Sequence, residues 1–197
     1  MIDVTELQSP AEAARFFRTV LSAFSTPATP LAVGPLPGAP EPLLPTTAAV
    51  ILSLADYQTP VWLSPQLNTE AARKYIRFNT GAPVTQEPRS AAFALLEHSE
   101  VLAHIDQFSI GTDAYPDRSA TLIVQCSGGF SSGHAAASGP GLKATVPFGV
   151  SGTDGKFWQR LQMNAQLFPL GLDFLFAAPA AIAALPRSTR LAMKETA

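Results

Sequence analysis

Two apolar runs near the end of the chain, Leu170–Ala177 and Ala181–Leu185, limit most strongly how this sequence can fold. Neither run shows a regular alternation with polar residues, which is typical of strands buried on both faces of a sheet. Pro179 lies between them and cannot donate a main-chain hydrogen bond to a ladder, so the chain is expected to turn there. The two runs therefore predict a central β-hairpin inside a covered sheet.

One carboxylate, Asp173, interrupts the first run. A carboxylate in an apolar strand is costly unless hydrogen-bond donors surround it. Arg187 follows the second run closely, so we expect an ion pair between Asp173 and Arg187 at the polar end of the hairpin. Arg187 is also the strongest candidate anion-binding residue, because a guanidinium matches the geometry of phosphate or phosphonate. The sequence leaves the structural and the anion-binding interpretations of Arg187 open.

The remaining elements are expected in the order helices first, then a strand-rich second half. Helices are predicted over 9–24, 48–55, 68–80, 97–108 and 154–167, and strands over 61–63, 91–96, 120–126, 135–138 and 142–146, with an extended loop over 27–45. The predicted helix N-caps are Ser9, Thr46 or Thr47, Asn68 and Asp154, and Gly81 is expected to end the third helix. This order favours a single domain over residues 1–197, a three-layer α/β/α fold with a mixed sheet.

Composition excludes several classes of protein. With 47% hydrophobic and 14% charged residues the chain is too apolar for disorder, and no run is long enough to span a bilayer. A net charge of −2 argues against binding nucleic acid. The single cysteine, Cys126, excludes an internal disulfide, and no signal-peptide core is recognisable, so a cytoplasmic protein is expected.

The residues around each candidate catalytic motif do not match those that its chemistry requires. Residues 129–133 match the pattern of a serine-hydrolase elbow, but no helix is predicted after them and no histidine follows His134, so a small-residue turn is the better interpretation. His98 and His104 do not have a standard metal-ligand spacing, and we expect surface or cap histidines and no metal site. No lysine has a sequence neighbourhood that marks it as a Schiff-base nucleophile.

A basic cluster, Arg73, Lys74 and Arg77, lies near the end of the predicted helix 68–80. It is suited to clamp an anion, but cations near a helix C-terminus are also favoured by the helix dipole, and the sequence leaves both interpretations open. Arg18 on the first helix and Asp56 in a predicted turn are further candidates. The candidate ligand-binding residues are therefore Arg187, Asp173, Arg18, Asp56 and Arg77.

Segments spread over nearly the whole chain resemble the PhnH family, which are subunits of the bacterial phosphonate carbon–phosphorus (C–P) lyase system. They are residues 15–27, 54–63, 77–83, 111–112, 115–116, 119–125, 138–141, 168–173 and 185–189, in the order found in the family. Asn79 departs from the family, in which we expect histidine to be common at that position.

The resemblance implies an α/β fold similar to that of pyridoxal-phosphate-dependent transferases, without the cofactor or its lysine. It implies a homodimer that joins PhnG, PhnI and PhnJ in a core complex. That complex, an alpha-D-ribose 1-methylphosphonate 5-triphosphate synthase, couples an alkylphosphonate to the ribose of ATP and releases adenine. The chemical steps are assigned to the partners, so a structural or binding subunit that is not catalytic alone is expected. The alternative is a subunit that contributes nucleotide- or phosphonate-binding residues.

Overall fold

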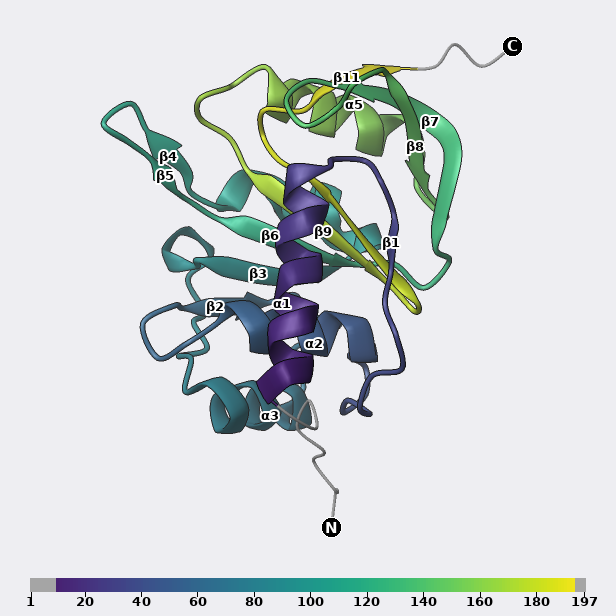
Figure 1. The fold of residues 1–197 in the computed structure, drawn as a ribbon. Coiled ribbons are helices and arrows are strands. Elements are labelled where there is room, and N and C mark those ends of the chain that lie inside the picture. Colours follow the sequence, from purple (N-terminus) through teal and green to yellow (C-terminus); the bar gives the residue numbers. More distant parts are fainter. Residues whose placement is uncertain (1–9, 194–197) are drawn as a thin grey trace.

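The structure is a computed structural model that describes residues 10–193 (Figure 1). Its centre is a six-stranded mixed sheet in the order β1-β10-β9-β6-β3-β2. Four neighbouring strands are parallel, and two more continue the sheet in antiparallel pairing. The parallel strands are β2 (Val61–Leu63), β3 (Phe93–Glu97), β6 (Thr121–Gln125) and β9 (Asp173–Ala178), and the antiparallel ones are β10 (Ala181–Leu185) and β1 (Leu31–Ala32). The predicted mixed sheet is confirmed.

The predicted hairpin is β9 and β10, which pair in antiparallel register from Ala178 opposite Ala181 to Phe174 opposite Leu185. The turn lies at Pro179, as predicted. Alternate residues of β9 enter two different cores, with Phe174 and Phe176 on one face and Leu175 on the other. Both faces are covered, which explains why these runs lack polar alternation.

Three helices cover one face of the sheet: α1 (Pro10–Ser25), α2 (Pro45–Leu54) and α3 (Glu70–Thr80). Figure 1 shows α1 crossing in front of the strands. Their apolar sides bury Val20, Ile51 and Ile76 in one core with Leu175 of the central hairpin. None of the helices between residues 10 and 193 is long and apolar enough to cross a lipid bilayer.

The opposite face is covered by helices and by a second sheet, so this outer layer is mixed. The helices are α4 (Val101–His104) and α5 (Gly155–Ala165), with 3₁₀ turns η1 (Pro88–Ser90), η2 (His98–Glu100) and η3 (Ile105–Gln107). The second sheet has the order β11 (Arg190–Met193), β7 (Phe130–Ser138), β8 (Val146–Val150). A separate hairpin, β4 (Ile110–Thr112) with β5 (Tyr115–Ser119), extends from the body (Figure 1).

Two predicted helix caps are wrong, and the first error comes from a tertiary contact. α2 begins at Pro45, so Thr46 and Thr47 lie inside the helix and are fully buried, while Leu44 is the N-cap. The Leu44 N–H donates to Gln125 Oε1 at 2.7 Å, 81 positions away in the chain. At α3 the cap is Thr69 and not Asn68, because Thr69 Oγ1 accepts from the Ala72 N–H at 3.1 Å.

Other helix ends follow the sequence. Asp154 Oδ1 accepts from the Phe157 N–H at 2.9 Å and caps α5, as predicted. Gly81 adopts φ 72°, the predicted left-handed stop of α3. The predicted N-cap Ser9 lies outside the described residues. The predicted helix 97–108 is broken into three short pieces, η2, α4 and η3.

The predicted strand over 142–146 is also wrong. The partner of β7 begins only at Val146, which pairs with Ala137. The intervening Gly139–Gly141 turn leaves the sheet and packs on the end of α1: a β-carbon at Gly141 would lie 2.2 Å from Ser25 O. The loop therefore joins the second sheet to the helical layer instead of closing a tight hairpin.

Candidate functional site

The predicted Asp173–Arg187 pair forms at the open end of the central hairpin. The hairpin register places the start of β9 beside the end of β10, and Arg187 follows Pro186 directly. Arg187 Nε lies 3.2 Å from each carboxylate oxygen of Asp173, Nη2 donates to Oδ2, and the Arg187 main-chain N–H donates to Oδ1 at 2.8 Å. The side chains are 15% and 19% exposed, so the predicted ion pair is confirmed and is largely shielded from water.

The third guanidinium nitrogen of Arg187 also donates a hydrogen bond. Nη1 donates to the main-chain oxygen of Pro116, in β5 of the projecting hairpin. Arg187 therefore ties three segments together: the central hairpin, the loop that follows it and β5. A guanidinium engaged through all three nitrogens has few donors left for an external anion, which favours the structural interpretation of Arg187.

The other three candidate residues lie elsewhere. Asp56 Oδ1 accepts from the Gln58 N–H at 2.9 Å and from Thr59 Oγ1 at 3.2 Å, which closes an exposed turn before β2. Asp173 begins β9, and two strands separate β9 from β2. The amino-terminal ends of β2 and β9 are therefore about 14 Å apart across the sheet. Arg18 is exposed on α1 and Arg77 on the last turn of α3. Of the five candidates, the structure brings together Asp173 and Arg187.

Two of the three cations of the basic cluster on α3 have partners close by in the chain. Arg73 Nη1 donates to the main-chain and side-chain oxygens of Asn68, at 2.9 and 2.7 Å. Lys74 pairs with Glu70 at 2.7 Å, and this contact holds the pKa of the Glu70 carboxyl below its usual range. No partner for the Arg77 side chain is present among the described residues, so one cation of the three remains available to a ligand.

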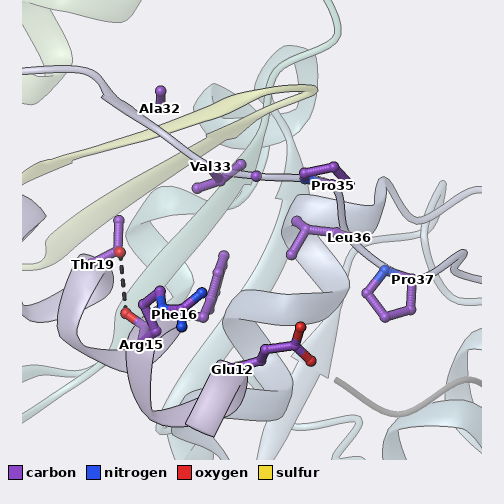
Figure 2. Close-up of a pocket in the computed structure, with 10 residues that line it drawn as sticks. Glu12, Arg15, Phe16, Thr19, Ala32, Val33, Pro35, Leu36 and Pro37 are labelled. Carbon is purple, nitrogen blue, oxygen red and sulfur yellow. Dashed lines mark hydrogen bonds between the residues drawn. The ribbon is translucent and has the colours of Figure 1, made fainter. Parts of the chain in front are cut away.

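A groove of about 510 Å³ lies between α1 and the proline-rich segment 32–37 (Figure 2). Figure 2 shows Glu12, Arg15, Phe16 and Thr19 of α1 on one side and the 32–37 segment on the other. The Thr19 hydroxyl is engaged, because it donates to the Arg15 main-chain oxygen at 3.2 Å. The groove combines apolar walls with one cation and one carboxylate. Such a lining suits binding, and it offers no activated nucleophile.

A polar network that the sequence interpretation missed lies at the carboxyl ends of β3 and β6. Gln125, 2% exposed, donates from Nε2 to Glu97 Oε1 at 2.6 Å and to the Pro42 oxygen at 2.9 Å, while its Oε1 accepts from the Leu44 N–H. Ligands of open α/β sheets bind at the carboxyl ends of the strands. Here the segment before α2 occupies that position, held by its hydrogen bonds to Gln125. The one signal in the sequence is an amide at the end of an otherwise apolar strand.

The next residue, Cys126, leads to a prediction about alkaline pH. Burial, and then the Glu97 carboxylate, raise the pKa of the Cys126 thiol well above its ordinary value. In the unfolded chain the thiol ionises above about pH 8.5, while in the folded protein it keeps its proton. The unfolded state then binds fewer protons, so stability falls as pH rises, by up to about 1.4 kcal/mol per pH unit.

We expect Cys126→Ala to lose less stability than the unsubstituted protein between pH 7.5 and 9.5, by about 1 kcal/mol. Urea denaturation followed by circular dichroism at both pH values measures the difference. The comparison is clean because the chain has one cysteine. Burial also raises the pKa of Tyr75, but an unfolded tyrosine ionises only near pH 10. Equal losses in the two proteins would contradict the prediction.

The histidines and the serine motif have structural surroundings. His134 stacks on Trp158 with ring centres 5.8 Å apart, and His104 lies 5.2 Å from the Trp62 ring. These two and His98 are half-buried, and His104 lies at the junction of α4 and η3. Residues 130–133 belong to β7, and no helix follows them, so the context that a hydrolase elbow needs is missing. The small-residue turn expected over 129–133 is wrong, because the turn lies at 127–128, before the strand. Within residues 10–193 no group of three or more His, Cys, Asp or Glu side chains could hold a metal ion.

Comparisons with known proteins agree with the resemblance in the sequence. Residues 6–192 match the family model PhnH, described as bacterial phosphonate metabolism protein. The alpha-D-ribose 1-methylphosphonate 5-triphosphate synthase subunit PhnH of Rhizobium meliloti (strain 1021) is 36% identical over 180 residues, which cover 91% of this chain and 90% of that protein. HtxG of Stutzerimonas stutzeri, named as a C-P lyase subunit protein, is 31% identical over 106 residues, 53% of each chain. The chain therefore belongs to the PhnH family.

Proposed function

We propose that this chain is the PhnH-type subunit of a bacterial alpha-D-ribose 1-methylphosphonate 5-triphosphate synthase. The assembly couples an alkylphosphonate to the ribose of ATP and releases adenine, before the carbon–phosphorus bond is cut. One observation carries the proposal: this chain and the Rhizobium meliloti subunit align over 91% and 90% of their lengths at 36% identity. Because nearly all of both chains is aligned, the whole subunit, and not one shared element, is the unit of comparison.

Within the assembly, the chain has a binding or structural role and is not catalytic alone. Two features support this role. The candidate residues do not converge on one pocket, and the strongest of them, Arg187, is engaged with Asp173 and Pro116. Among the described residues, large apolar side chains are left exposed on several surfaces, which suits contacts with other proteins. They are Phe17, Leu21, Leu102, Met163, Leu167, Phe168 and Phe78.

The fold is that of a pyridoxal-phosphate-dependent transferase that has lost its cofactor. The mixed sheet with parallel central strands is compatible with this relationship. A lysine that binds pyridoxal phosphate as a Schiff base must be shielded from water, but Lys74, Lys143 and Lys156 are exposed, and Lys194 lies outside the described residues. The described lysines therefore do not fit the cofactor. The partners are a second copy in the isolated protein and PhnG, PhnI and PhnJ in the cytoplasmic complex.

The proposal is tested by mixing the purified chain with PhnG, PhnI and PhnJ from the same bacterium. We expect the chain to co-elute with them in size-exclusion chromatography, and we expect adenine release from ATP and methylphosphonate to require it. The chain alone is expected to release no adenine. Release by the chain alone, or failure to co-elute, would contradict the proposal.

The same mixture tests the alternative, an anion-binding role for Arg187. Arg187→Ala, assayed at a temperature where circular dichroism shows it folded, is expected to assemble and support synthesis like the unsubstituted chain. Normal assembly with a loss of synthesis of about 100-fold or more, the range seen when a donor that stabilises the reacting group is removed, would favour the alternative.

A further inference from the structure

A second groove, of about 890 Å³, lies along the outer side of α3. One wall is the helix side that carries Ala71, Tyr75 and Phe78, which are spaced by four and three positions and so share a face. Pro40, from the segment before α2, also lines it. We call this surface the α3 groove.

Phe78 is the most unusual residue of the α3 groove. Its side chain is 83% exposed, the highest value among the exposed large hydrophobic residues of the described chain. Tyr57, 73% exposed, lies near the same end of the helix, because a β-carbon at Gly81 would be 3.4 Å from Tyr57 Cβ. Aromatic side chains left in water beside a groove are enriched where proteins bind one another.

The rim of the α3 groove carries a net positive charge. Glu70 and Lys74 neutralise each other in their 2.7 Å ion pair. Arg77 has no side-chain partner among the described residues and lines the groove next to Phe78. Tyr75 adds no negative charge, since burial raises the pKa of its phenol. A carboxylate on the bound segment would complete this surface, because Arg binds carboxylates through two parallel hydrogen bonds.

We propose that the α3 groove docks another subunit of the complex, through an amphipathic segment with a large apolar side chain and a neighbouring carboxylate. The apolar side chain packs beside Tyr75 and Phe78, and the carboxylate pairs with Arg77. This inference rests on the proposed function. A second copy of this chain fits less well, because a two-fold contact centred on Phe78 would bring the Arg77 side chains of both copies together.

The test measures the dissociation constant of the full chain for the other subunits of the complex, purified together, by isothermal titration calorimetry. We expect Phe78→Glu to raise it about 30-fold or more, as for an interface anchor, and Arg77→Glu about tenfold. Tyr115→Glu is the matched control, since Tyr115 is an aromatic residue that is 51% exposed but lies on β5, outside the groove. It should stay within about threefold of the unsubstituted chain, and affinity should fall as salt increases.

The outcomes separate this inference from the proposed function. If the unsubstituted chain binds and Phe78→Glu binds within about threefold of it, the docking surface is elsewhere and the subunit role stands. If the unsubstituted chain does not bind the other subunits, both are wrong. If Phe78→Glu leaves their affinity unchanged but turns a dimer into a monomer in sedimentation analysis, the groove binds a second copy and the assignment to another subunit is overturned.

Discussion

Replacing Arg187 with alanine is expected to lower the free energy of unfolding by about 3 kcal/mol. The substitution leaves the shielded Asp173 carboxylate with the Arg187 main-chain N–H as its remaining donor from this contact, and it frees the Pro116 oxygen. Removing one partner of a shielded ion pair is costly because the other charge stays where water cannot solvate it. Urea denaturation at pH 7, followed by circular dichroism, measures the change.

Two further variants control this experiment. Arg18→Ala removes an exposed guanidinium from α1 and is expected to change stability by less than about 0.5 kcal/mol. The double variant Asp173→Leu with Arg187→Met removes both charges and should recover most of the loss, since apolar replacements of buried pairs are often neutral. An Arg187→Ala midpoint equal to that of the unsubstituted protein would show that the pair contributes no stability.

Gly141→Ala is expected to destabilise the fold by about 3 kcal/mol, which for a chain of this length lowers the melting temperature by roughly 6–12 °C. Gly141 has φ 83°, where a β-carbon is strained, and that β-carbon would lie 2.2 Å from Ser25 O and 2.9 Å from Pro27 Cδ. Neither neighbour is the free end of a flexible side chain. The end of α1 must therefore shift away from the 139–141 turn, which separates the helical layer from the second sheet.

Gly38→Ala is the matched control for this prediction. A β-carbon at Gly38 would meet no atom within 4 Å, and its φ is outside the left-handed region. It is expected to be neutral or to raise stability by a few tenths of a kcal/mol, because alanine restricts the unfolded chain more than glycine does. Differential scanning calorimetry gives both melting temperatures. Equal values for Gly141→Ala and Gly38→Ala would mean that the close approach to Ser25 is not maintained in solution.

The central hairpin and its ion pair could be predicted because their information is local. Two apolar runs separated by Pro179 specify two buried strands and a turn, and the strands then bring Asp173 and Arg187 together through their own register. The αL stop at Gly81 and the Asp154 cap are local in the same sense. Each depends on a few neighbouring residues, so no knowledge of distant contacts was needed.

The polar network at the strand ends could not be predicted, because it joins residues far apart in the chain. Gln125 bonds to Leu44, Pro42 and Glu97, and this contact sets where α2 begins. The α3 groove is similar. The spacing of apolar residues along α3 predicts that this side of the helix is buried. Phe78 is nevertheless exposed to water, because no other segment of the described chain covers its side chain. Local propensity does not report which faces remain uncovered.

The sequence by itself determined the two-sided burial of the central strands, the charge pair that ends them and the membership of the PhnH family. These features follow from the types of residues and from their spacing over short stretches of sequence, so they do not depend on how distant segments pack. Only the tertiary structure decided that Asp56, Arg77 and Arg18 lie apart from Arg187, and that one aromatic side of α3 is left open. Those properties depend on the packing of distant segments against one another.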